Sequence, residues 1–171
     1  MKSTVHCDLI DQTFAGPYGI LPLAGYLRRN GRRWVGSALP PDMKRGPQGQ
    51  CFRNAWQLSL SHGLPYCEGY GWDVELGALP FPHAWNLCRS SGRVIDTTWA
   101  IGRRAVYLGI ELSPKQLMKI IDSTECFGVL QDGRRDALEI VEHTLGLKPI
   151  PVDAGERCPK RERHADPLLP R

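Results

Sequence analysis

Three side chains in the middle of the sequence have the types needed for nucleophilic chemistry on a carbonyl group: Cys51, His83 and Asp96. A thiol becomes a useful nucleophile at neutral pH when its thiolate is stabilised. A histidine within hydrogen-bond reach forms an ion pair with the thiolate and later protonates the leaving group, and a carboxylate fixes the tautomer and orientation of the imidazole. Together they predict catalysis through a covalent acyl-enzyme.

The pattern around Cys51 predicts a helix that begins at this residue. Apolar residues recur at helical spacing over residues 51–60, and Gly63, a typical C-cap, follows His62. We therefore expect a helix over Cys51–His62 with the thiol in its first turn. There, unpaired N–H groups and the positive end of the helix dipole stabilise a thiolate.

The other two side chains fall in runs that are typical of antiparallel strands. These runs, separated by Gly, Pro and Ser-rich turns, cover residues 66–72, 83–88, 93–98 and 104–110. The turn Ser90-Ser91-Gly92 is short enough for a hairpin, so we expect the strands of His83 and Asp96 to be neighbours. Their side chains can then meet on one sheet face, against which the helix of Cys51 packs.

The rest of the chain predicts one domain over residues 1–149. Residues 1–49 are rich in Gly and Pro, and only residues 20–27 and 33–39 look ordered, so this loop-rich segment is expected to cover the domain. Ser113-Pro114 predicts the start of a helix that runs to Thr124, and a second helix is expected over residues 134–145. The charged, Pro-containing residues 150–171 are expected to form a flexible tail.

Four short motifs, in this order along the chain, resemble the transglutaminase-like superfamily: Gly49-Gln50-Cys51, Glu68-Gly69-Tyr70, His83-Ala84-Trp85 and Val94-Ile95-Asp96-Thr97-Thr98-Trp99. The resemblance covers about residues 46–110. It implies a papain-like α+β fold, with the catalytic helix packed on a small antiparallel sheet and helices at the C-terminal end. It also implies that Cys51, His83 and Asp96 form the catalytic triad of a peptidase, amidase, deamidase or acyltransferase.

The chain departs from the family at two points. It has Thr98-Trp99 where the family commonly has Pro-Thr, and its compact core argues against a large calcium-dependent cross-linking enzyme. Its small size resembles that of minimal hydrolases encoded by bacteria and their viruses, the phages. The resemblance leaves peptide or amide hydrolysis and acyl transfer as open alternatives, because both proceed through the same acyl-enzyme.

An oxyanion hole needs hydrogen-bond donors near the thiol, and the usual donors are the backbone N–H of the nucleophile and a side-chain amide. Gln50, Gln48 and Asn54 are the amides nearest to Cys51 in the sequence. Gln50 ranks slightly above Gln48 because it immediately precedes the nucleophile. Trp85 and Trp99 are expected to wall the substrate cleft.

Composition narrows the class of protein. The chain has 171 residues, 42% of them hydrophobic, which is enough for one core. No apolar run approaches the roughly 20 residues of a membrane helix, and no signal peptide opens the sequence, so a cytoplasmic protein is expected. The six cysteines include no CxxC pair. We therefore expect free thiols, no metal and no cofactor, with a protein or peptide as the substrate.

Two other classes of protein stay open. The formal charge of +4 is uneven, because Arg28, Arg29, Arg32 and Arg33 lie close together. A catalytically inactive module could use them to hold a protein or nucleic-acid partner, although no aromatic-interleaved motif typical of nucleic-acid binding accompanies the charges. The second alternative is a protein that binds a metal through Cys and His. The identity of the substrate and the oligomeric state are not encoded in any pattern.

Overall fold

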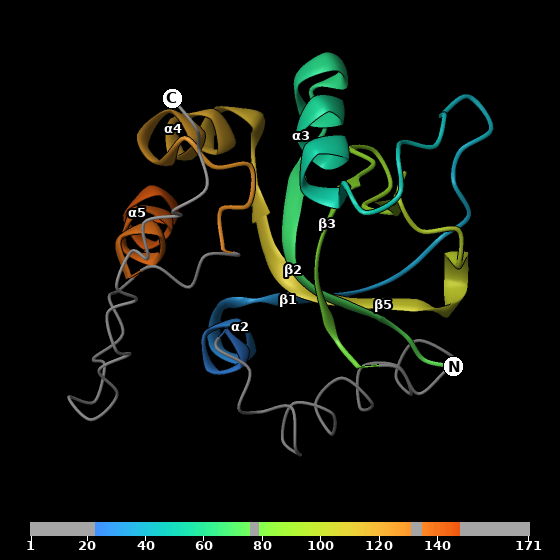
Figure 1. The fold of residues 1–171 in the computed structure, drawn as a ribbon, viewed down its shortest axis with the longest axis horizontal. Coiled ribbons are helices and arrows are strands. Elements are labelled where there is room, and N and C mark those ends of the chain that lie inside the picture. The colour runs from blue at the N-terminus through green and yellow to red at the C-terminus, as the bar shows by residue number, and fades with distance from the viewer. Residues whose placement is uncertain (1–22, 76–78, 131–134, 148–171) are drawn as a thin grey trace, which may run out of the picture.

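The computed structural model describes residues 23–75, 79–130 and 135–147, and it has a mixed α+β fold (Figure 1). One antiparallel sheet has the strand order β1-β5-β2-β3-β4. Its strands are β1 (Arg32–Val35), β2 (Tyr66–Asp73), β3 (Phe81–Leu87), β4 (Val94–Ile95) and β5 (Ala105–Leu112). The helices of the described residues are α2 (Ala24–Asn30), α3 (Cys51–His62), α4 (Pro114–Thr124) and α5 (Arg135–Leu145), with a short 3-10 turn, η2 (Gly102–Arg104). The α+β class is confirmed.

The two longest strands, β2 and β5, form the centre of the sheet. They pair over their whole lengths, from Tyr66 opposite Leu112 to Asp73 opposite Ala105. β3 pairs along the other edge of β2, while β1 pairs with β5. Helix α3 packs along β3 and β2, and α4 packs against α5 at one end of the sheet (Figure 1).

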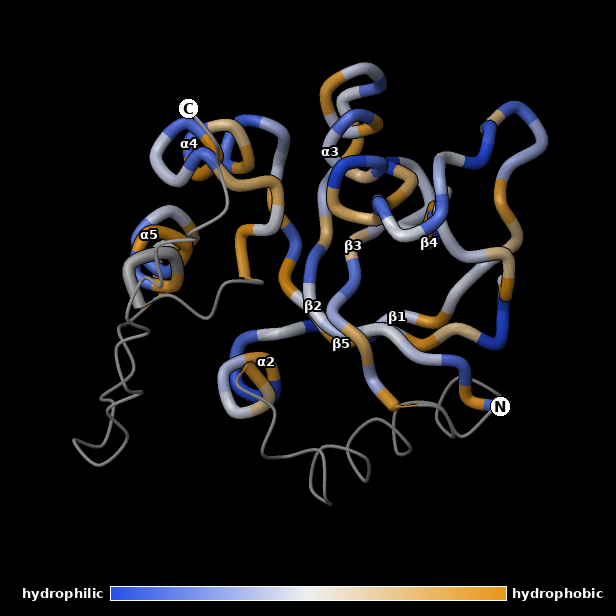
Figure 2. The backbone as a smooth tube through the Cα atoms, in the orientation of Figure 1, coloured by the Kyte–Doolittle hydropathy of each residue, from blue (hydrophilic) through white to orange (hydrophobic). Residues whose placement is uncertain are grey.

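Each face of the sheet covers a separate core, because side chains alternate along a strand. One core joins the sheet to the helices and is built mainly from aliphatic residues, among them Leu27, Leu108 and Leu117. The other, the aromatic core, is smaller and contains the rings of Trp34, Trp85, Tyr107 and the partly buried Trp99. In Figure 2, α4 and α5 carry hydrophobic and hydrophilic residues on different sides, as expected for helices that cover a core.

Local sequence signals set the ends of α3 and α4. Helix α3 has the predicted bounds and ends at Gly63, whose φ of 64° is the left-handed conformation that favours glycine. Helix α4 begins after Ser113, whose side chain accepts from the backbone N–H of Gln116, while the Gln116 side chain accepts from the backbone N–H of Ser113. This reciprocal capping box explains why the predicted bounds of α4 are also correct.

The strand that was expected over residues 93–98 is wrong in length. β4 contains only Val94 and Ile95, which pair with Leu87 and Asn86 of β3. The chain leaves the sheet at Asp96, because the Asp96 carboxylate accepts the backbone N–H groups of Thr98 and Trp99. A side chain that binds the backbone two and three residues ahead forms a local turn in place of a ladder.

Other expected elements differ by a few residues from those observed. β3 begins two residues before His83, at Phe81, and β5 continues to Leu112. In the N-terminal segment, β1 ends at Val35, so the order expected over residues 33–39 is only partly strand. Residues 1–22 and the expected tail over residues 150–171 lie outside the described residues. No helix of the described part has the length and apolar character needed to cross a membrane.

Candidate active site

Cys51 is the first residue of α3 and is a free thiol with only 8% of its surface exposed. The backbone of the N-cap residue, Gln50, accepts from the N–H of Asn54 at 2.8 Å, but its side chain makes no capping hydrogen bond. An α-helix leaves the N–H groups of its first turn without intrahelical partners. Those donors, and the positive end of the helix dipole, are therefore available beside the thiol.

Asn54 fastens the segment before Cys51 to the segment after β4. Its amide donates to the Pro47 carbonyl at 2.9 Å and to Thr98 Oγ1 at 2.8 Å, and the side chain is buried. The backbone N–H of Gly46 also donates to the Thr97 carbonyl at 2.9 Å. Because both amide hydrogens are used, Asn54 acts here as a structural bridge.

His83 and Asp96 meet inside the protein. Nε2 of His83 lies 2.8 Å from Oδ2 of Asp96, and the two residues are 1% and 6% exposed. Three more groups donate to the same carboxylate: the hydroxyl of Tyr107 to Oδ2 at 2.8 Å, and the backbone N–H groups of Thr98 and Trp99 to Oδ1 at 2.8 and 3.0 Å. The carboxylate is thus saturated and fixed in orientation.

The charges of this cluster reinforce one another. Burial alone lowers the pKa of His83, but hydrogen bonds to Asp96 and to Cys51, together with their negative charges, outweigh burial and raise that pKa to about 9. Burial also raises the pKa of Asp96, yet His83 and the two backbone N–H groups outweigh it and hold the pKa below its usual value. At neutral pH the pair is therefore an imidazolium and a carboxylate. With Nε2 bonded to Asp96, Nδ1 is the ring nitrogen left for the thiol.

Aromatic rings enclose His83. Trp99 stacks on the imidazole with ring centroids 3.9 Å apart and planes within 19°. Trp85, which was expected to wall the cleft, is 1% exposed and lies inside the aromatic core, with its ring edge-on to Trp34 at 5.5 Å. A face-on ring stabilises a neighbouring cation and keeps water away from it, so Trp99 favours the charged imidazole.

Glycines make room for these rings. The residue paired with His83 on β2 is Gly69, where a Cβ atom would clash with the backbone of Leu108 and Gly109 in β5. A Cβ atom at Gly71 would lie 3.0 Å from the Trp99 ring and 3.1 Å from the Tyr107 ring, and one at Gly109 would lie 2.7 Å from the Trp85 ring. A side chain at Gly71 or Gly109 would therefore collide with the rings packed against this face of the sheet.

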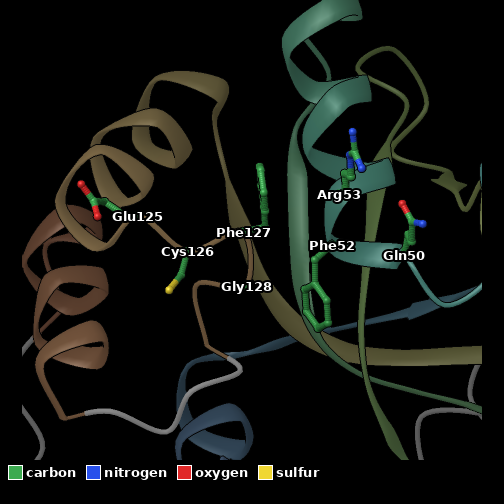
Figure 3. Close-up of a pocket in the computed structure, with 7 residues that line it drawn as sticks. All are labelled: Gln50, Phe52, Arg53, Glu125, Cys126, Phe127 and Gly128. Atoms are coloured by element: carbon green, nitrogen blue, oxygen red, sulfur yellow. The ribbon is translucent and has the colours of Figure 1, made fainter. Parts of the chain in front are cut away.

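Gln50 and Gln48, the expected oxyanion donors, are both exposed. Gln50 lies at the edge of a pocket of about 510 Å³ between the first turn of α3 and the segment after α4 (Figure 3). The pocket is lined by Gln50, Phe52, Arg53, Glu125, Cys126, Phe127 and Gly128. Gln50 and Phe52 flank Cys51 in the chain, but Cys51, His83 and Asp96 are not among the residues that line the pocket.

Glu68 holds the far wall of this pocket. It is 1% exposed, and its carboxylate accepts the backbone N–H groups of Val129 at 2.8 Å and Leu130 at 2.6 Å and the hydroxyl of Tyr66 at 2.6 Å. The Tyr66 hydroxyl also lies 3.3 Å from the carbonyl of Phe127. The segment that carries Phe127 is therefore fixed to β2 by a buried carboxylate.

Two other thiols have contrasting surroundings. Cys67 is completely buried in β2, and burial raises its pKa well above the usual value. Cys88 lies at the start of the β3–β4 turn, where hydrogen bonds from Ser90 and Ser91 lower its pKa to about 6. A test of Cys51 by alkylation must therefore remove Cys88 as a competing thiolate.

Three of the clustered arginines near the N-terminal end interact with groups of the fold itself. Arg28 and Arg29 lie in the last turn of α2, where a positive charge complements the helix dipole. Arg32 forms an ion pair with Glu111 at 2.6 Å, and its guanidinium lies 5.5 Å from the centre of the Trp34 ring.

Two residues of the site were absent from the sequence-based prediction. Tyr107 lies in an apolar run, and its hydroxyl reaches Asp96 only because β5 and β3 flank β2 in the sheet. Glu68 stands in a motif, but its backbone partners are 61 and 62 residues away. The one signal that could have indicated burial of this carboxylate is the alternation along β2, which puts Glu68 on the same face as Tyr66 and Tyr70.

Comparisons with known proteins leave the family open. No protein-family model, curated protein or solved structure matches the chain. The transglutaminase-like resemblance therefore stays a prediction that rests on the four motifs. Within residues 23–75, 79–130 and 135–147, no group of three or more His, Cys, Asp or Glu side chains could hold a metal ion.

Proposed function

We propose that the chain is a cysteine-dependent acyl-transfer enzyme with a transglutaminase-like active site, in which Cys51 is the nucleophile, His83 the acid and base, and Asp96 the residue that orients His83. The observation that carries this proposal is the buried His83–Asp96 pair, 2.8 Å apart, with Cys51 at the uncapped start of α3 close enough to His83 to raise its pKa. A merely structural histidine does not require both a carboxylate and a thiol as partners.

The chemical steps follow from these positions. The Cys51 thiolate attacks the carbonyl carbon of an amide or thioester, and the carbonyl oxygen becomes an oxyanion near the free N–H groups of the first turn of α3. The His83 imidazolium then donates its proton to the leaving amine or thiol as the carbon–heteroatom bond breaks. A thioester between substrate and Cys51 remains. His83, now neutral, takes a proton from the acceptor that attacks this thioester, and the C–S bond breaks to release the Cys51 thiolate beside the reprotonated imidazolium.

The acceptor decides the class of enzyme. Water as the acceptor releases a carboxylic acid, which is peptidase or amidase activity, and this is the proposed reaction. An amine as the acceptor gives acyl transfer through the same intermediate. Support for a peptide substrate comes from the pocket at the first turn of α3, where the apolar rings of Phe52 and Phe127 and the polar side chains of Gln50 and Arg53 line one space.

The direct test is alkylation of Cys51 in a Cys88→Ser background, which removes the competing thiolate of the hairpin turn. We expect iodoacetamide to label Cys51 at pH 6 to 7 at least about tenfold faster than a free cysteine peptide, because a stabilised thiolate is the reacting form. Peptide mass mapping locates the label. The matched control is His83→Ala, in which Cys51 should label at the rate of an ordinary thiol at that pH.

Acyl transfer itself is tested with p-nitrophenyl acetate, a small activated ester. The enzyme hypothesis predicts a burst of p-nitrophenolate and an acetyl group on Cys51, both absent from Cys51→Ala. Labelling of Cys51 no faster than the peptide control, together with the absence of an acetyl adduct, would overturn the proposed function.

A further inference from the structure

Tyr107 contacts the proposed catalytic group from a strand that carries none of the triad. It lies on β5, is 1% exposed, and donates its hydroxyl proton to Oδ2 of Asp96 at 2.8 Å. The same oxygen lies 2.8 Å from Nε2 of His83. One carboxylate oxygen thus serves two hydrogen bonds, and only one of them belongs to the triad.

The position of Tyr107 is set by the packing of the sheet. Its partner on β2 is Gly71, and its ring packs against that of Trp85 with centroids 4.6 Å apart. The absence of a side chain at Gly71 leaves the path from β5 to Asp96 open, because a Cβ there would lie 3.1 Å from the Tyr107 ring. The ring is therefore held so that its hydroxyl can reach only a narrow region, and Asp96 occupies that region.

Donation from a phenol changes what a carboxylate does to its other partner. A hydroxyl proton on Oδ2 stabilises the ionised form of Asp96, which is needed to orient His83. It also offsets part of the negative charge on that oxygen, so the attraction between Asp96 and the protonated imidazole is weaker than it would be with an unshared oxygen. Both effects act on the proton of His83.

Resting on the proposed function, we infer that Tyr107 is a positioning residue of the active site: its hydroxyl fixes Asp96 toward His83 and limits how strongly Asp96 holds the His83 proton. A weaker hold of Asp96 on the His83 proton would assist catalysis, because His83 must give its proton to the leaving group and then take one from the acceptor. A general acid and base works best when its proton affinity is close to that set by the working pH.

Within the described residues, the titratable groups that face His83 come from three elements. They are Cys51 at the start of α3, Asp96 after β4, and Tyr107 on β5. The residue paired with His83 on β2 is Gly69, which has no ionisable side chain. A change at Tyr107 therefore acts on His83 through Asp96, and replacing Cys51 removes the other ionisable neighbour.

The test is a titration of His83 by NMR of its ring nitrogens, in Cys51→Ala and in Cys51→Ala with Tyr107→Phe. The signal of His83 is assigned by its loss in His83→Gln. Loss of the phenol proton should raise the pKa of His83 by about half a unit to one unit, since Asp96 then attracts the imidazolium with less compensation. With Cys51 present, Tyr107→Phe should lower the rate of acetylation by p-nitrophenyl acetate about tenfold and move its alkaline limb to higher pH.

The matched control is Tyr70→Phe. Tyr70 is also a buried tyrosine, its hydroxyl accepts from the backbone of Leu23, and it lies in the aliphatic core on the opposite face of the sheet. Its loss should leave the pKa of His83 within about 0.2 unit of the reference. A second probe, 3-fluorotyrosine at position 107, keeps the ring and the hydroxyl but donates more strongly, so it should lower the pKa of His83.

The outcomes separate this inference from the proposed function. The role of Tyr107 is overturned if the pKa of His83 is unchanged or lowered in Tyr107→Phe. If Tyr107→Phe does not fold, an unchanged pKa of His83 in the 3-fluorotyrosine protein overturns it. The expected shift of His83 combined with an unreactive Cys51 supports the contact between Tyr107, Asp96 and His83 but overturns the proposed function.

Discussion

Two buried carboxylates of this protein, Asp96 and Glu68, are held in nearly the same way. Asp96 accepts the backbone N–H groups of two consecutive residues and the hydroxyl of Tyr107. Glu68 likewise accepts two consecutive backbone N–H groups and the hydroxyl of Tyr66. Asp96 differs because an imidazole, that of His83, shares its second oxygen.

That difference separates a carboxylate that supports the fold from one that can support chemistry. The hydrogen bonds that Glu68 accepts from the peptide groups of Val129 and Leu130 and from a phenol fasten one segment to β2. Asp96 acts on His83, whose pKa of about 9 lets it change its charge in an accessible range of pH. A buried acid therefore becomes a candidate for catalysis through its titratable partner, not through burial itself.

The largest expected effect comes from removing the charge of Asp96. In Asp96→Asn the amide keeps the size of the side chain but no longer holds a protonated imidazole, so the pKa of His83 should fall well below 9. We expect acetylation of Cys51 by p-nitrophenyl acetate to slow by about 10²- to 10⁴-fold. Retention of more than half of the rate would show that Asp96 does not orient His83.

The corresponding exchange at Glu68, from carboxylate to amide, should lower the stability of the fold and leave the pKa of His83 unchanged. Glu68→Gln turns an amide N–H₂ group toward backbone N–H donors and leaves at least one buried donor without an acceptor. We expect the free energy of unfolding, measured by urea denaturation, to drop by about 2 to 4 kcal/mol. The pKa of His83 should stay the same; a shift comparable to that in Asp96→Asn would make the two carboxylates equivalent and contradict the contrast.

The pH dependence of stability should show the His83–Asp96 pair. His83 binds its proton more tightly in the folded state, so its contribution is complete below its unfolded pKa of 6.5 and is lost as the pH rises through about 9. We expect a loss of up to about 3 kcal/mol over that range. The contribution of Asp96, whose pKa is lowered, is present above 3.8 and is lost in stronger acid.

Urea denaturation of the protein and of His83→Gln, at several pH values between 6 and 9.5, measures the contribution of His83. The difference between the two curves removes the contribution of other groups, such as Cys67, that also titrate in alkali. A difference that does not change with pH would contradict a raised pKa for His83.

The smallest expected effect comes from removing the Tyr66 hydroxyl that donates to Glu68. Tyr66→Phe removes a hydroxyl whose single proton points to the Glu68 carboxylate at 2.6 Å, with the Phe127 carbonyl as a longer second acceptor at 3.3 Å, and it should cost about 1 to 2 kcal/mol of stability. The pKa of His83, measured by NMR in a Cys51→Ala background, should not change. Tyr107→Phe is its counterpart on Asp96, and only that variant should move the pKa of His83.

Much of the fold could be predicted because its signals are local. The bounds of α3 and α4 follow from Cys51, Gly63, Ser113 and Gln116, each of which acts within one helical turn. The hairpin between β3 and β4 follows from a short turn that ends at Gly92, whose φ is 65°. The local rule failed for β4, where the Asp96 side chain competes for backbone N–H groups that a strand would have paired.

The sequence indicated which residues could form the candidate site, but not which side chains around it are buried or exposed. The motifs named Cys51, His83 and Asp96, but they did not indicate that Trp85 is buried or that Gln48 and Gln50 are exposed. Burial of a strand residue depends on what lies across the sheet. For Trp85 the deciding features are Trp34 at its edge and the space left by Gly109.

The sequence by itself determined which groups are present, where two helices begin and end, and which strands form a hairpin, since these depend on residues a few positions apart. Only the tertiary structure decided which groups form hydrogen bonds with one another. Tyr107 and His83 both bond to Oδ2 of Asp96, and Glu68 accepts from a backbone N–H group 61 residues away. Such pairs depend on strand register and on glycines that leave space between strands. Register is a property of the whole sheet, so no short stretch of sequence encodes it.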